Sequence, residues 1–147
     1  MANPQVPQGT LNRVRCSIVV PSFSNLNITA AYMGKSMATI TFDESPWVDQ
    51  IQTATGTVSS PEPYVMATIN VGILRTQSLA QSWMTQAQST GVIGDVTIHS
   101  DTASFSAIPL TDVVIKSFDP GAFDGVDPVS KLVLRGVFYI NNNLWSL

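Results

Sequence analysis

Residues 64–91 read YVMATINVGILRTQSLAQSWMTQAQSTG, and this stretch decides the fold. Its first half alternates between apolar and mixed side chains, which is the period of a β-strand. One face of the expected strand carries Val65, Ala67, Ile69, Val71 and Ile73. The alternation stops at residues 75–77, so we expect a long strand with one apolar face that ends in a turn.

The second half of this stretch predicts the one convincing helix of the chain, at about residues 78–90. Ser78 and Gln81 have the spacing of a capping box, and Gly91 is a suitable stop because glycine accepts a left-handed cap. A helix of about three turns is too short to be stable alone in water. We therefore expect it to dock on the strand, with Trp83, Leu79 and Met84 as its anchor in the core.

The polar face of this helix carries amides and hydroxyls, with no charged residue between Arg75 and Asp95. A neutral polar face is easier to desolvate than a charged one, which favours burial against another subunit. An ordinary solvent-facing surface is the alternative. The residues expected at subunit contacts are Gln81, Gln86 and Gln88 on the helix, with Pro4, Pro7 and Trp145 in the terminal segments.

Composition points in the same direction. Charged residues make up 12% of the 147 residues, where about 25% is usual, so we expect burial of outer surface against copies of the chain or other partners. The net charge of −3 disfavours a general affinity for nucleic acid, which needs clustered Lys and Arg. We expect one domain over residues 1–147, without a membrane span or a signal peptide.

The rest of the chain predicts further strands at residues 12–20, 36–42, 47–57, 92–99, 105–118 and 131–140. An extended arm at residues 1–11 precedes them, and an apolar tail at residues 141–147 follows. The fold class expected from this pattern is mainly β, an antiparallel β-sandwich or partly closed barrel with one flanking α-helix. Such a sheet has edges, and edges invite pairing with another chain.

Two turns divide the central strands in this prediction. Asp43–Pro46 would join strands 36–42 and 47–57 into a hairpin with a small, threonine-rich face. That face could line a pore, bury against a neighbouring strand or meet solvent. The prolines of Ser59–Pro63 would then separate this hairpin from the central strand.

No catalytic signature is present. The sequence contains no glycine-rich phosphate loop, no GxSxG and no HExxH. Cys16 fits a small hydrophobe in a strand and His99 a surface residue, because one Cys and one His make neither a zinc set nor a defensible catalytic pair. The aspartates of residues 119–127 do not have EF-hand spacing. We expect no enzyme, no cofactor and no metal.

Residues 61–86, PEPYVMATINVGILRTQSLAQSWMTQ, resemble tail tube proteins of contractile-tailed bacteriophages, a fold similar to that of type VI secretion tubes. In those proteins a long strand ends at a similar turn and enters a short helix with an aromatic anchor. The closing run KLVLRGVFYINNNLW, residues 131–145, is similar in character to their last strand.

This resemblance implies a structural virion protein that forms six-subunit rings, stacked into a tail tube whose lumen conducts DNA during ejection. It implies strands joined into one inner barrel, terminal arms that reach the next ring, and sheath, tape-measure and baseplate proteins as partners. The location implied is the virion tail, after assembly in the host cytoplasm. Because such lumens tend to be acidic, the resemblance places Asp43, Glu44, Asp49 and Asp95 towards the channel.

Three other functions remain open at this point. The first is a soluble β-sandwich module that binds a carbohydrate or a receptor. The second is a baseplate tube-initiation protein of similar fold. The third is a small enzyme whose site cannot be read from one sequence.

Overall fold

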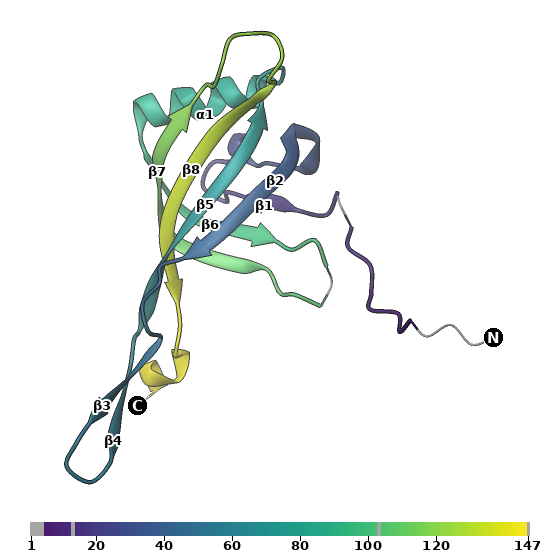
Figure 1. The fold of residues 1–147 in the computed structure, drawn as a ribbon. Coiled ribbons are helices and arrows are strands. Elements are labelled where there is room, and N and C mark those ends of the chain that lie inside the picture. The colour runs from purple at the N-terminus through teal and green to yellow at the C-terminus, as the bar shows by residue number, and fades with distance from the viewer. Residues whose placement is uncertain (1–4, 13, 103, 147) are drawn as a thin grey trace.

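A six-stranded antiparallel sheet curls into a half-barrel (Figure 1). The computed structural model describes residues 5–12, 14–102 and 104–146, without the side chains of residues 36, 37, 145 and 146. The order across the sheet is β1 (Ser17–Val19), β6 (Val92–His99), β7 (Ile108–Asp119), β8 (Val129–Tyr139), β5 (Tyr64–Leu74) and β2 (Met33–Phe42). Outside this sheet lie a hairpin of β3 (Val48–Gln52) and β4 (Thr57–Pro61), helix α1 (Ser78–Ser89), and the 3-10 turns η1 (Ser24–Leu26), η2 (Ala30–Tyr32) and η3 (Asn142–Ser146). A mainly β fold with one flanking α-helix is therefore confirmed.

Strand β5 lies inside the sheet and organises it. It pairs with β8 over its whole length, from Tyr64 opposite Tyr139 to Leu74 opposite Val129, and with β2 on its other side. The five side chains expected on one face, from Val65 to Ile73, are all buried. The period-two pattern therefore located both the strand and its core-facing side.

Helix α1 packs over the buried face of the sheet. Trp83 is fully buried and Leu79 is 6% exposed, in one core with η1 and the apolar face of β5. Met84 is 38% exposed, so the expectation that it anchors the helix was wrong. The physical reason is helical geometry, because Met84 lies about 100° around the axis from Trp83.

The helix begins at Ser78 as expected, but neither end has the cap that the sequence predicted. In the described part of the chain, no side chain caps its N-terminus, and Ser82 Oγ donates to the Ser78 carbonyl instead (3.3 Å). At the other end the Thr90 amide bonds the Gln86 carbonyl (2.8 Å). The left-handed glycines described are Gly9, Gly94, Gly121 and Gly125, so neither the capping box nor the Gly91 cap is present.

The predicted hairpin between residues 36–42 and 47–57 does not form. Strand β3 pairs with β4 instead, with Val48 opposite Pro61 and Ile51 opposite Val58. Thr53 closes the turn through its amide and hydroxyl, both donating to the Gly56 carbonyl. Residues 59–61 therefore belong to a strand rather than separating two. Proline is tolerated there because β4 is an edge strand.

Three strand boundaries also differ from those expected. Strand β1 covers only Ser17–Val19 of the expected 12–20, and β7 begins at Ile108 rather than at residue 105. In β6, an irregular register around Gly94 (φ 78°) buries Ile93 and leaves Val92 59% exposed. A bulge of this kind shifts the alternation by one residue, which a strict period-two pattern cannot follow.

Candidate assembly surfaces

The face of the sheet opposite α1 is half-exposed to exposed. Towards the β7–β8 loop it carries Lys131 opposite Asp119, whereas the next two rows carry only the charge of Arg135. Two rows of residues cross it in register. One row is Thr41, Thr68, Arg135 and Val114, and the next is Thr39, Asn70, Val133 and Ser117. We call these eight residues the open face. Small hydroxyl and amide groups there can bond water without carrying charge.

The positive charge of Arg135 on the open face is offset by a neighbouring carboxylate. Arg135 forms an ion pair with Asp43 (Nη2 to Oδ2, 2.7 Å) and donates to Thr68 Oγ1 from Nη1 (3.0 Å). The two charged side chains are 30% and 44% exposed, so the pair contributes little to stability. The consequence of the pair is electrostatic. The carboxylate of Asp43 offsets the positive charge of the Arg135 guanidinium, which would otherwise attract an anion.

Strand β2 is a long edge of the sheet. It has ten residues, and within the described ranges β5 is its one strand partner. The opposite edge strand, β1, has three residues and is bridged on its outer side by Ile28. Strand β2 therefore presents the longer row of backbone donors and acceptors open to another chain.

The β3–β4 hairpin projects away from the half-barrel, beside the C-terminus (Figure 1). Both strands are exposed along their length, apart from half-buried Pro61. The pair Ile51 and Val58 lies 50% and 52% exposed on one side. A lone two-stranded hairpin is marginally stable in water, so this one is suited to packing against another chain.

The base of the hairpin is fixed to the body. Asn141 Nδ2 donates to the carbonyl oxygens of Trp47 (3.0 Å) and Glu62 (2.8 Å). The rings of Phe42, Trp47 and Phe138 cluster there, with centroids 5.0–6.4 Å apart. These contacts aim the hairpin in one direction, although among the described residues its two strands form a sheet of their own.

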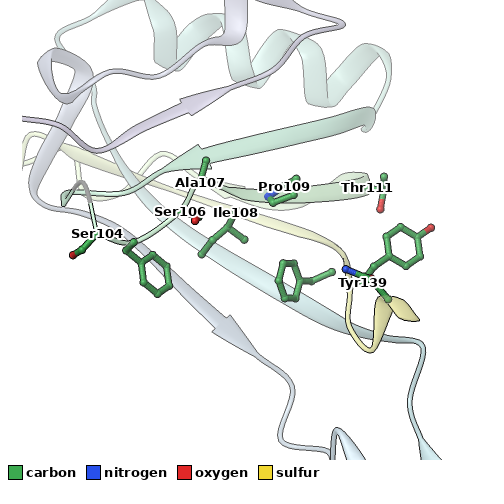
Figure 2. Close-up of a pocket in the computed structure, with 10 residues that line it drawn as sticks. Ser104, Ser106, Ala107, Ile108, Pro109, Thr111 and Tyr139 are labelled. Carbon is green, nitrogen blue, oxygen red and sulfur yellow. The ribbon is translucent and has the colours of Figure 1, made fainter. Parts of the chain in front are cut away.

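An apolar depression of about 1050 Å³ opens at the start of β7 and the end of β8. We call it the end pocket. It is lined by Ser104–Pro109, Thr111, Phe138, Tyr139 and Asn142 as far as the described residues extend. Figure 2 shows Ile108, Pro109 and Tyr139 around it. A second depression continues from Phe105 and Ile108 towards β2, along the mouth of the half-barrel.

Cys16 and His99 both line that second depression. Burial, and secondarily the carboxylate of Asp101, raise the pKa of the Cys16 thiol, which keeps it protonated and unreactive near neutral pH. Among the described residues no group of three His, Cys, Asp or Glu side chains could hold a metal ion. None of the helices in the described ranges has the length and hydropathy needed to cross a membrane.

The residues expected at subunit contacts are placed as follows. Gln81 and Gln88 are exposed on α1, where Gln81 Nε2 donates to Thr85 Oγ1 (3.2 Å). Gln86 is half-buried and its Nε2 donates to the Thr90 carbonyl (2.9 Å). Pro7 is exposed in the extended arm. Pro4 and the side chain of Trp145 lie outside the described residues.

The four carboxylates expected to face a channel do not gather in one place. Asp43 and Glu44 follow the end of β2, and Asp49 lies in the projecting hairpin. Asp95 lies in β6, separated from β2 by β7, β8 and β5. Only Asp43 adjoins the open face, and its charge is offset there by Arg135.

The end pocket and the β3–β4 hairpin were not found from the sequence. The pocket joins residues 104–111 to residues 138–142, which no local pattern connects. The hairpin left one usable signal in the sequence, a glycine at the end of the turn at residues 53–56, between the apolar residues Ile51 and Val58. A glycine in that position is a common hairpin turn residue.

No family model matches the chain, and neither does any curated protein. Among solved structures, the chain is similar to the cryo-EM structure of the anti-feeding prophage cap, described as the AFP tube terminating cap. The sequences are 13% identical and the TM-score is 0.50, with 94% of this chain and 97% of that chain covered. The likeness therefore shows a shared fold over nearly the whole of both chains.

Proposed function

We propose that this chain is a structural subunit of a contractile-tail assembly, and that it forms rings of six copies stacked into a tail tube. The observation that carries the proposal is the open ten-residue edge of β2 in a half-barrel. The neighbour of similar fold is named as a tube terminating cap, which supports a role in a tail. We assign the chain no catalytic role.

Ring formation follows from the geometry of the sheet. A half-barrel with a free β2 edge can continue its hydrogen-bond ladder into the next copy. When the ring closes, that edge disappears and the sheets become one continuous inner wall. The low charge of the chain fits extensive contact between copies, because few charges then need to be desolvated.

The open face suits the lumen of such a tube. Its threonines and asparagine meet water without charge, and Arg135 is offset by Asp43. Each basic group that touches DNA phosphate adds to a salt-dependent attraction. A wall of this chemistry lets DNA pass without retaining it, and sheath, tape-measure and baseplate proteins would be the other partners in a virion tail.

Replacing Asp43 with asparagine tests the lumen assignment. The change leaves Arg135 without its carboxylate, so assembled protein should bind short duplex DNA at low salt and release it as salt rises. Fluorescence anisotropy of labelled DNA with assembled variant measures this. The control is Glu44→Gln, which removes the same charge from a carboxylate that has no ion-pair partner in the described part of the chain. Equal DNA binding by the two variants would contradict the assignment.

A tube-end protein is the second candidate, because the similar chain is itself a cap. Negative-stain electron microscopy and sedimentation of purified protein at micromolar concentration separate these functions. Long tubes support the tube subunit, whereas single rings that do not grow support a terminating or initiating protein. A strictly monomeric protein that binds a glycan would support a binding module and overturn both.

A further inference from the structure

The loop between β7 and β8 is ordered by its own polar contacts. Three aspartates accept hydrogen bonds from amides two or three residues ahead, at 2.9–3.2 Å. These bonds are Asp119 with Gly121, Asp124 with Val126 and Asp127, and Asp127 with Val129. Arg75 adds a bond to the Asp127 carbonyl and stands 5.3 Å from the ring of Phe123. The loop is therefore shaped before it meets a partner.

This ordered loop presents two bare apolar side chains. Phe123 is 85% exposed and Val126 is 84% exposed, more than any other large hydrophobic side chain among the described residues. Exposed apolar groups are common on protein surfaces, but a fixed loop that holds an aromatic ring outward resembles the buried anchors of protein interfaces. We call Phe123 and Val126 the loop anchor.

The end pocket has the chemistry to receive such an anchor. Phe105, Ile108, Phe138 and Tyr139 supply apolar surface, and the described lining contains no Asp, Glu, Lys, Arg or His. A phenyl ring and an isopropyl group can enter it without desolvating a charge. The volume of about 1050 Å³ exceeds that of two such side chains, and the serines at its rim can meet the backbone of the loop.

The anchor and the pocket lie at opposite ends of one strand. Strand β8 begins at Val129, next to the loop, and ends at Tyr139, in the pocket lining. Eleven residues of strand span roughly 35 Å, and Figure 1 shows the loop and the C-terminal end far apart. One chain cannot join them, but two copies stacked along β8 can. Such a head-to-tail contact repeats without closing on itself.

The area involved points to a repeated contact rather than an isolated dimer. An aromatic side chain buries about 150–250 Å². Counting both side chains of the loop anchor and the pocket surface that covers them, the contact removes about 600 Å² from water. Stable pairwise interfaces bury about 1,200 Å² or more. One contact is therefore weak, whereas several made in parallel between two rings reinforce one another.

We propose that the loop anchor of one copy inserts into the end pocket of the copy stacked on it, and that this contact joins successive rings. The inference rests on the proposed tube function, because stacked rings make this weak contact several times in parallel. It assigns a role to the two most exposed large hydrophobic side chains of the described residues and to the uncharged pocket together.

Cysteine crosslinking tests the contact directly. Val126→Cys and Ser106→Cys are combined with Cys16→Ala, and assembled protein is oxidised and run on a non-reducing gel. Because each copy then carries one thiol at each end, a ladder of dimers, trimers and longer chains is expected. Each single cysteine variant is the control and can give dimers at most. Rings or tubes that yield no ladder would overturn the contact and leave the tube function standing.

Phe123→Ser supplies a readout without new thiols. The side chain is exposed, so the variant should fold, form rings and fail to stack in electron micrographs. Val92→Ser, at another exposed valine, is the matched control and should stack normally. Tubes of unchanged length from Phe123→Ser would refute the contact. Absence of rings from the wild-type protein, together with absence of a ladder from the double-cysteine variant, would refute both proposals. A ladder without rings would refute the ring function alone.

Discussion

Replacing Trp83 with alanine is expected to lower the free energy of unfolding by about 3–5 kcal/mol. Trp83 is fully buried and is the largest of the fully buried side chains in the described core. Its removal leaves a cavity between α1, η1 and β5, and a helix of three turns has little stability of its own. Urea unfolding of unassembled protein, followed by circular dichroism, measures the change.

Two further variants make this result specific. Met84→Ala, on the same helix but 38% exposed, should cost less than about 1 kcal/mol. Trp83→Phe should cost clearly less than Trp83→Ala, because it keeps apolar volume and removes Nε1, which has no hydrogen-bond partner in the described part of the chain. Similar losses for Trp83→Ala and Met84→Ala would show that the helix is not held by Trp83.

Removal of the hairpin is expected to abolish tubes while leaving the monomer folded. Residues 49–60 would be replaced by a short glycine-serine link, which keeps Trp47 and Glu62 for their bonds to Asn141. Since β3 and β4 form a separate two-stranded sheet in the described part of the chain, the melting temperature should stay within about 5 °C of the original. Sedimentation should show the loss of assemblies, because an exposed hairpin of this kind needs another chain to cover it.

A finer pair of variants locates the contact within the hairpin. Ile51→Ser with Val58→Ser removes the apolar cross-strand pair and should weaken assembly. Gln50→Ser, at the neighbouring position that faces the other way, is the matched control. Assembly that survives removal of the whole hairpin would exclude it as a subunit contact.

The sequence revealed those parts of the fold that depend on long, regular patterns. The alternation from Val65 to Ile73 runs without interruption, and the stripe through Leu79 and Trp83 has helical spacing, so β5 and α1 were placed correctly. Local irregularity defeated the same reasoning elsewhere. The register change at Gly94 left Val92 exposed. The turn at Gly56 ended the expected strand of residues 47–57 early, and β4 formed at Thr57–Pro61.

The candidate surfaces were less predictable because they join distant parts of the chain. Asp43 was expected to face a channel, but its partner Arg135 lies 92 positions away and is brought to it by the pairing of β2, β5 and β8. The end pocket likewise needs the start of β7 and the end of β8 to meet. Few charges and a sheet with open edges were visible from composition and pattern, and these carried the assembly hypothesis.

Cryo-electron microscopy of assembled protein tests the central claim most directly. The account predicts a hollow tube in which β2 of each subunit continues the sheet of the next, with Thr39, Thr41, Thr68 and Asn70 turned towards the lumen. A tube with β2 left unpaired, or with the open face turned outward, would contradict the account. So would protein that remains monomeric at every concentration.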